Sequence, residues 1–87
     1  MTNQTVLFVD DEVKVLKALR RLCRSEAFDT VFAECGAQAL EIMANQPIDL
    51  VVSDLRMPEM DGAELLSKIE ALFPDVPRVL LLSLIHI

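Results

Sequence analysis

The segment 49–62 limits what this chain can fold into more than any other, because a short apolar run within it ends abruptly in a carboxylate. The run 50–52 is too short for a helix and is partly β-branched, and Asp54 is followed closely by Pro58 and Gly62. This pattern predicts a buried strand with Asp54 at its C-terminal tip. Because ligands of open α/β sheets bind at such tips, the position of Asp54 indicates chemistry.

A second acidic tip follows the apolar run 5–9, where Asp10, Asp11 and Glu12 come in succession. If the two runs are neighbouring parallel strands, Asp10, Asp11 and Asp54 converge. Gathered carboxylates repel one another unless a cation lies between them, and a hard divalent ion with oxygen ligands is the usual solution. The pattern therefore predicts a Mg2+ site. The alternative is that Asp10 and Asp11 cap the following helix while Asp54 begins a polar turn.

Taken in this order, the two acidic motifs resemble those of receiver domains in two-component response regulators. The resemblance extends over about residues 6–83 and is carried by the segments 7–12, Gly36 with 39–41, 49–58 and 60–62. It implies that Asp54 is the phospho-acceptor and that a histidine kinase or phosphotransfer protein donates the phosphoryl group. It also implies a signalling module and no enzyme.

The resemblance further implies the ligands of the site. Mg2+ would be held by Asp11, Asp54 and the backbone carbonyl of Arg56, with Asp10 adjacent or bridging through water. Ser83 matches the position where the family carries a Ser or Thr at the tip of the fourth strand. A hydroxyl there contacts the phosphoryl group and couples modification to shape. Without the resemblance, a lone Ser ending a strand is most often a turn residue.

Alternating apolar patterns predict an α/β fold of order βαβαβαβ, a parallel sheet with helices on both faces. The resemblance makes this a flavodoxin-like, doubly wound receiver sheet whose strand order in the family is 2-1-3-4-5. In addition to the strand that ends at Asp54, we expect strands at 5–9, 30–33 and 79–82, with 30–33 as an outer strand. We expect helices over 13–25, from Gly36 to before Pro47, and from Gly62 to before Pro74.

Each predicted helix has one apolar face that we expect to be buried. These faces comprise Val15, Leu16, Leu19, Leu22 and Cys23 in the first helix, Ala37, Leu40, Met43 and Ala44 in the second, and Leu65, Leu66, Ile69, Leu72 and Phe73 in the third. Asp61 and Glu64 resemble a capping box at the start of the third helix. The opposite face of the first helix is basic and forms a solvated surface, which we favour, or docks an acidic partner; it comprises Lys14, Lys17, Arg20, Arg21 and Arg24.

The end of the chain departs from the family pattern. Residues 84–87 continue an apolar run that matches no family feature, so we expect one domain over 1–87, truncated after the fourth strand and lacking the last strand and last two helices. The family's lysine at the tip of the fifth strand is not supplied, because the lysines are Lys14, Lys17 and Lys68. Mg2+ would then neutralise the phosphoryl oxygens almost alone, and we expect switching to be impaired.

Composition argues against several other classes. A net charge of −6 disfavours nucleic-acid binding through phosphate neutralisation. No apolar run reaches the roughly 18 residues of a membrane span, and no signal-peptide pattern is present, so we expect a cytoplasmic protein without membrane contact. Cys23 and Cys35 are too few and too irregularly spaced for a disulfide framework or a zinc site, and we expect reduced thiols.

Two further functions compete with the receiver. In the first, the chain is a non-signalling fragment that forms a homodimer, because 78–87 would be an apolar edge strand that pairs edge to edge or exchanges its C-terminal segment. In the second, it is a magnesium phosphohydrolase with an aspartyl nucleophile. That chemistry needs a second carboxylate close after the nucleophile, whereas residue 56 is Arg, so we rank it last.

Overall fold

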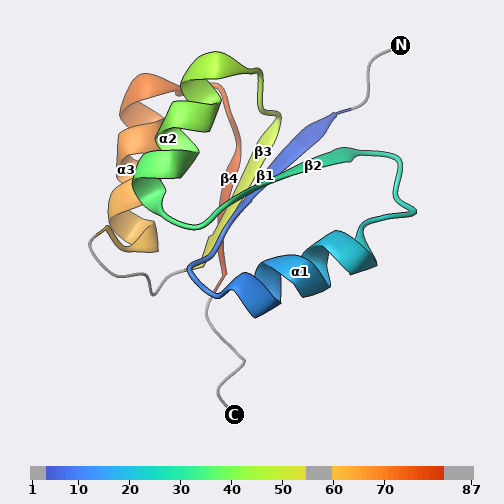
Figure 1. The fold of residues 1–87 in the computed structure, drawn as a ribbon. Helices are drawn as coiled ribbons and strands as arrows, with labels where there is room; N and C mark the ends of the chain where they lie inside the picture. Colours follow the sequence, from blue (N-terminus) through green and yellow to red (C-terminus); the bar gives the residue numbers. More distant parts are fainter. Residues whose placement is uncertain (1–3, 55–59, 82–87) are drawn as a thin grey trace.

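The computed structural model describes residues 4–54 and 60–81, and strands and helices alternate through them (Figure 1). The elements are β1 (Thr5–Val9), α1 (Val13–Leu22), β2 (Asp29–Ala33), α2 (Gly36–Asn45), β3 (Leu50–Asp54), α3 (Gly62–Leu72) and β4 (Arg78–Leu81). The predicted order βαβαβαβ is confirmed. The predicted tail 84–87 lies outside the described residues, and so does the predicted end of the fourth strand at Leu82.

All strand pairs are parallel, and the sheet order is β2-β1-β3-β4. The predicted outer position of the second strand and the family order 2-1-3-4 are therefore both confirmed. Val9 pairs with Ala33 on one side and with Ser53 on the other. Because these three residues lie at one level, the connections that follow β1, β2 and β3 all begin at the same edge of the sheet.

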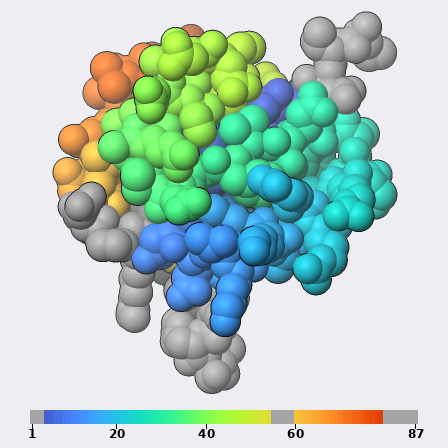
Figure 2. All heavy atoms as spheres, in the orientation of Figure 1, coloured from blue at the N-terminus to red at the C-terminus, as the bar shows by residue number. Residues whose placement is uncertain are grey.

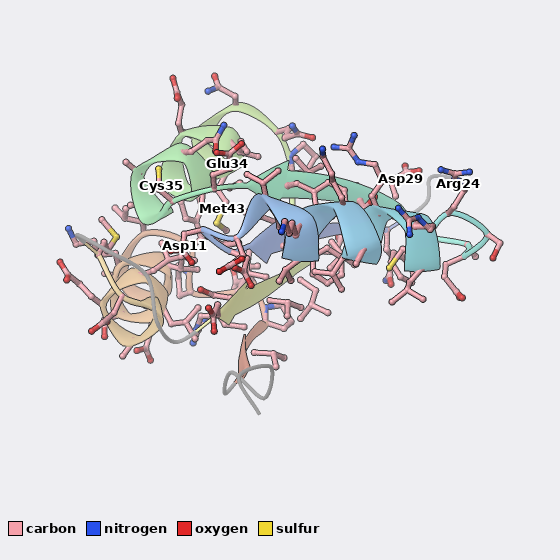
Figure 3. The ribbon with its side chains drawn as sticks, turned by 60° about the horizontal axis from the view of Figure 1, so that its bottom comes forward. Asp11, Arg24, Asp29, Glu34, Cys35 and Met43 are labelled. Carbon is pink, nitrogen blue, oxygen red and sulfur yellow. The ribbon has the colours of Figure 1, made fainter. Side chains whose placement is uncertain are left out.

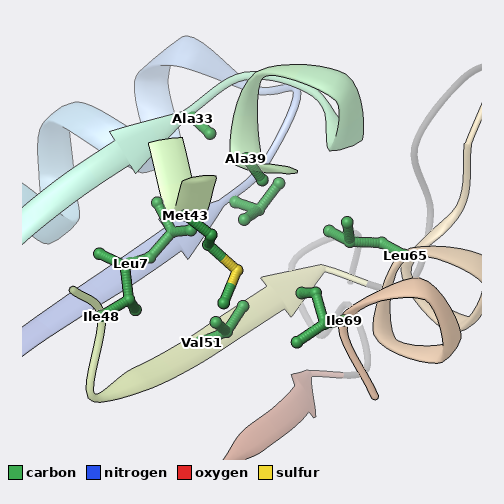
Figure 4. Close-up of a cluster of buried hydrophobic side chains, with 9 residues drawn as sticks. Leu7, Ala33, Ala39, Met43, Ile48, Val51, Leu65 and Ile69 are labelled. Atoms are coloured by element: carbon green, nitrogen blue, oxygen red, sulfur yellow. The ribbon is translucent and has the colours of Figure 1, made fainter. Parts of the chain in front are cut away.

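The helices cover both faces of the sheet, with α2 and α3 on one face and α1 on the other (Figure 1). Successive strand residues point to opposite faces, so Leu7 and Val9 pack beneath α2 and α3 while Val6 and Phe8 pack against α1. The larger core cluster, on the α2 and α3 face, is drawn in Figure 4 and consists of Leu7, Val9, Ala33, Ala39, Met43, Ile48, Val51, Leu65 and Ile69.

The α1 face has a smaller, partly aromatic core. Val6, Phe8 and Leu16 are buried, and the rings of Phe8 and Phe32 stack with centroids 5.7 Å apart. The guanidinium of Arg20 lies 4.9 Å from the centre of the Phe32 ring. Arg20 therefore covers part of the sheet as well as carrying charge, which neither the favoured solvated face nor the docking alternative included.

The buried face of α2 differs from the prediction by about one residue of helical rotation. Gly36, Ala39 and Met43 are buried, whereas the predicted Ala37 and Ala44 are exposed. The prediction favoured the side with Leu40, but the side that faces the core is the one with Ala39 and Met43. Leu40 is half-buried at the margin of this face.

The last residues of α1 and α3 also differ from the prediction. Helix α1 ends at Leu22 instead of residue 25, and Leu22 is 72% exposed. Leu72, the last residue of α3, is 63% exposed, although Leu65 and Ile69 on the same face are fully buried. Both leucines stand at helix ends, where the sheet no longer covers the apolar stripe. Within the described part of the chain, no helix has the length and apolar character needed to cross a membrane.

Candidate functional site

The site is built from two strand ends. Asp10 and Asp11 directly follow β1, and Asp54 is the last residue of β3. Since β1 and β3 are adjacent and parallel, the structure brings the three carboxylates together, with one ligand atom from each lying within 4.8 Å of the others. This group, Asp10, Asp11 and Asp54, is called the acidic cluster below.

Asp10 is the buried member of the acidic cluster, with 8% of its surface exposed. Its backbone N–H donates to the carbonyl of Ala33 at 3.1 Å, which continues the pairing of β1 with β2. Its carboxylate Oδ1 accepts a hydrogen bond from the backbone N–H of Glu12 at 2.8 Å. One carboxylate oxygen thus shapes the turn, and the second is left for a ligand.

The alternative that these residues cap the first helix does not match the geometry. The N-cap residue of α1 is Glu12, and no side chain provides the capping hydrogen bond there. Asp10 lies three residues before Val13, the first residue of α1, and Asp11 is exposed. Helix capping therefore does not account for the presence of Asp10 and Asp11 at the end of β1.

The environment of Asp10 raises the pKa of its carboxyl above the ordinary value of 3.8. Burial is the largest cause, and the negative charges of Asp54, Asp11 and Glu12 act in the same direction. The hydrogen bond from the Glu12 N–H partly opposes this rise in pKa. A cation placed among the carboxylates would remove the repulsion, so the electrostatics of the acidic cluster favour metal binding.

Asp54 is half-buried and follows a fully buried serine. The hydroxyl of Ser53 donates to the backbone carbonyl of Asp54 at 3.0 Å, so it is turned toward its own backbone. Ser53 lies opposite Val9 on β1 and Leu80 on β4. Because Ser53 is fully buried and Asp54 is only half-buried, a reactant can reach Asp54 but not Ser53.

The acidic cluster lies at one end of the sheet. Figure 3 shows Asp11 at the same end as Glu34 and Cys35, which follow β2, while Arg24 and Asp29 lie at the opposite end. Arg56 and Ser83, the other two predicted site residues, lie outside the described residues. Of the predicted site, the structure therefore describes the three carboxylates alone.

None of the three lysines stands at the end of a strand. Lys14 and Lys17 belong to α1, and Lys68 belongs to α3, where its Nζ lies 3.8 Å from the carboxylate of Glu64.

In the space-filling view, α1 in blue and α2 in green both reach the front surface (Figure 2). A hollow of about 180 Å3 lies between them and includes Lys17, Arg20, Phe32 and Glu34 in its lining.

A parallel sheet of order 2-1-3-4, with helices on both faces and carboxylates at the C-terminal ends of its first and third strands, defines a flavodoxin-like receiver module. The chain belongs to the response regulator receiver domain family, whose sequence pattern matches residues 6–85. The family resemblance drawn from the sequence is thereby confirmed.

Characterised relatives agree with this family membership. The chain is 42% identical over 76 residues to the transcriptional regulatory protein GlrR of Escherichia coli (strain K12), covering 87% of this chain but only 17% of GlrR. It is 32% identical over 83 residues to the sporulation initiation phosphotransferase F of Bacillus subtilis (strain 168), covering 95% of this chain and 66% of that protein. The chain thus spans a small part of the first relative and about two thirds of the second.

Solved structures give the same fold. The signal receiver domain of an HD domain-containing protein from Pseudomonas fluorescens Pf-5 matches with a TM-score of 0.89 and 34% identity, over 92% of this chain and 64% of that one. A CheY-like receiver domain from Methanospirillum hungatei JF-1 matches with a TM-score of 0.87 and 26% identity, over 95% and 69% of the two chains.

Proposed function

We propose that this chain is a phospho-acceptor in two-component signalling, in which Asp54 receives a phosphoryl group in the presence of Mg2+. The observation that carries the proposal is the acidic cluster, whose ligand atoms lie within 4.8 Å of one another at the strand ends of a receiver-family sheet. Histidine kinases or phosphotransfer proteins are the proposed donors. The name of the Bacillus subtilis relative, a phosphotransferase, fits such a relay.

The residues of the acidic cluster fit a magnesium ion. Mg2+ takes oxygen ligands at about 2.0–2.1 Å in an octahedron, so its ligand atoms lie roughly 3 to 4 Å apart. The carboxylate atoms here lie within 4.8 Å, and small side-chain rotations would bring them to that spacing. Asp11, Asp54 and the backbone carbonyl of Arg56 are the proposed direct ligands, with Asp10 adjacent or bridging through water.

The proposed transfer is a displacement at phosphorus. A carboxylate oxygen of Asp54 forms the new P–O bond, the P–N bond to the donor histidine breaks, and the imidazole takes back that electron pair. Mg2+ supplies charge neutralisation of the phosphoryl oxygens. Ser83 is proposed to donate a hydrogen bond to one of those oxygens. Because the lysines of this chain lie on helices, we expect weak coupling of phosphorylation to shape in the 87 residues given.

The thiols and the net charge of the chain support a reducing compartment and protein partners for the proposed transfer. Cys23 and Cys35 are free thiols, which fits the reducing cytoplasm. A net charge of −6 makes direct nucleic-acid binding by these 87 residues unfavourable. The proposed partners are therefore proteins, and any output through nucleic acid would need a different surface.

The test is phosphorylation by a small donor such as acetyl phosphate. We expect the protein to form a hydroxylamine-labile acyl phosphate that depends on Mg2+ and is abolished in Asp54→Asn. Ser53→Ala is the matched control, because Ser53 is adjacent in sequence but buried. A modification that survives hydroxylamine, or that disappears in Ser53→Ala and persists in Asp54→Asn, would remove the phospho-acceptor function.

A specific observation also favours self-association as a second function. Among the described residues, β4 pairs with β3 alone, and Val79 on β4 is 42% exposed. An apolar strand whose edge is unpaired tends to form backbone hydrogen bonds with a strand of another chain. We propose a two-fold homodimer, joined edge to edge through β4 or formed by exchange of the C-terminal segment, with residues 73–77 as the hinge.

A further inference from the structure

The hollow between α1 and α2 lies beside β2, the outer strand of the sheet (Figure 1). Its volume is about 180 Å3, and its apolar lining comes from Val13 and Leu16 of α1 and from Phe32 of β2. Leu16 is buried and Phe32 is half-buried, and both pack in the smaller core on the α1 face. The hollow therefore offers apolar contact surface next to a strand edge.

Two cations of α1, Lys17 and Arg20, line the same hollow and are exposed. Within the described part of the chain, the salt bridges involve Lys68 and Arg78, so neither Lys17 nor Arg20 is paired with a carboxylate. The guanidinium of Arg20 lies 4.9 Å from the centre of the Phe32 ring. Stacking uses the face of a guanidinium and leaves its in-plane N–H donors available to an anion. The hollow therefore has two positive groups that can bind carboxylates.

The edge of β2 beside this hollow has backbone groups that point away from the sheet. Among residues 4–54 and 60–81, β2 pairs with β1 alone. Asp29 donates its N–H at 2.8 Å and Ala33 accepts at its carbonyl at 3.1 Å, both on the β1 side. Because backbone direction alternates along a strand, the N–H and C=O groups of Thr30 and Phe32 point to the outer side. An added strand would find a donor and an acceptor at each of these two positions.

The outer edge of β2 ends at the first turn of α2. The backbone N–H of Glu34 donates to Oε1 of Gln38 at 2.7 Å, and both residues line the hollow. Glu34 adds one negative charge to the lining, against the two positive charges of Lys17 and Arg20. The lining is therefore positive, in a chain whose net charge is −6.

We propose that the edge of β2 and this hollow form a docking site for an extended peptide that has carboxylate side chains at alternate positions. The backbone of the peptide would pair with the outward groups of Thr30 and Phe32 and add a strand to the sheet. Every second side chain of that strand would point to the α1 face, as Phe32 does, and meet Lys17 and Arg20 there. Acidic side chains match the positive lining. The site needs neither Mg2+ nor a phosphoryl group, so it goes beyond the proposed function.

The experiment is an NMR titration of the 87-residue chain, without Mg2+, with an end-capped peptide of alternating glutamate and threonine. Bound peptide should protect the amides of Thr30 and Phe32 from hydrogen exchange, while exchange at Val31, whose amide faces β1, stays unchanged. A peptide of alternating lysine and threonine should not bind. Absence of saturable binding, protection that does not alternate along β2, or equal binding of the two peptides would overturn the proposal.

Substitutions on α1 separate the hollow from the rest of the basic helix face. Lys17→Gln and Arg20→Gln should each raise the Kd of the acidic peptide about two- to fivefold, the range for loss of an exposed ion pair. Lys14→Gln and Arg21→Gln are the matched controls, because they remove exposed cations of the same helix that do not line the hollow. They should leave the Kd unchanged. Equal losses in all four variants would show that α1 attracts the peptide through its overall charge, which would rule out the site.

Sedimentation of the same variants tests a different role for the two cations. Charged side chains beside a strand edge also protect it from pairing with other copies. If the double variant of Lys17→Gln and Arg20→Gln self-associates while the wild type binds no acidic peptide, the cations protect the edge and the docking site is wrong. Because Arg20→Gln also removes the contact with Phe32, Lys17→Gln, at an exposed position, decides the result if Arg20→Gln fails to fold.

Discussion

Val9 of β1 and Ser53 of β3 are paired in register, so the residues that follow them, Asp10 and Asp54, lie at the same level at the edge of the sheet. A shift of one residue in this pairing would separate the two carboxylates by an extra rise of about 3.3 Å and turn one of them to the other face. The acidic cluster is therefore a product of strand register as much as of sequence.

Removal of Asp11 should weaken Mg2+ binding without harming the fold. Asp11 is exposed and belongs to the acidic cluster, so Asp11→Ala removes a ligand but no core contact. We expect millimolar binding in the wild type, because Mg2+ keeps several waters. The variant should bind at least about tenfold more weakly. Calorimetric titration measures this, with Asp75→Ala as a control that removes an exposed carboxylate before β4. Unchanged binding in Asp11→Ala would show that the site is wrongly assigned.

Asp10 should make the metal-free protein less stable as pH rises. Its folded pKa is raised above 3.8, mainly by burial, so between these two values the folded chain binds more protons than the unfolded chain. Stability from this group is therefore complete below 3.8 and is lost as pH rises through the folded pKa.

Asp10→Asn should remove this loss while keeping an acceptor for the Glu12 N–H. At pH 7 without metal, the variant should melt higher, by about 4–8 °C for each kcal/mol gained in a domain of this size. Thermal unfolding from pH 3 to pH 8 measures the effect. With saturating Mg2+ the order should reverse, since only the wild type gains the full binding energy. A lower melting temperature of Asp10→Asn in the metal-free state would contradict the prediction.

Asp61 should contribute to stability as a helix cap. Its Oδ1 accepts a hydrogen bond from the Glu64 N–H at 2.8 Å, which confirms the predicted N-cap of α3. The carboxylate of Glu64 lies 3.8 Å from the Nζ of Lys68. Of the predicted capping box, the structure therefore shows the bond accepted by Asp61 and places the Glu64 side chain beside Lys68. Asp61→Ala should cost about 0.5–2 kcal/mol in urea denaturation, whereas Asp61→Asn should cost little. Equal losses in the two variants would point to the charge and not to the cap.

Because β4 pairs on one side only among residues 4–54 and 60–81, we expect its other edge to make the chain dimeric at micromolar concentration. Val79 is exposed and its neighbour Val52 is only half-buried, so a second copy would cover apolar surface here. Val79→Glu should weaken the dimer at least tenfold, about 1.4 kcal/mol, in sedimentation equilibrium. Charged substitutions at Leu82 and Ile85, outside the described residues, should yield aggregate or unfolded chain.

Leu22→Glu is the control for this prediction, because Leu22 is equally apolar and 72% exposed but belongs to the end of α1. It should leave the dimer intact. A well-folded wild-type monomer at micromolar concentration would rule out the dimer.

The sequence by itself determined the order of elements and the carboxylates at two strand ends. The runs before Asp10 and Asp54 are short and apolar, and a following carboxylate marks where each strand ends, so local pattern was sufficient. The tertiary structure decided which side of α2 is buried and which helix ends stay exposed, because those depend on what packs against them. It alone revealed that Gly36 and Met60 touch, since residues 24 positions apart meet only when β2 and β3 flank the same central strand.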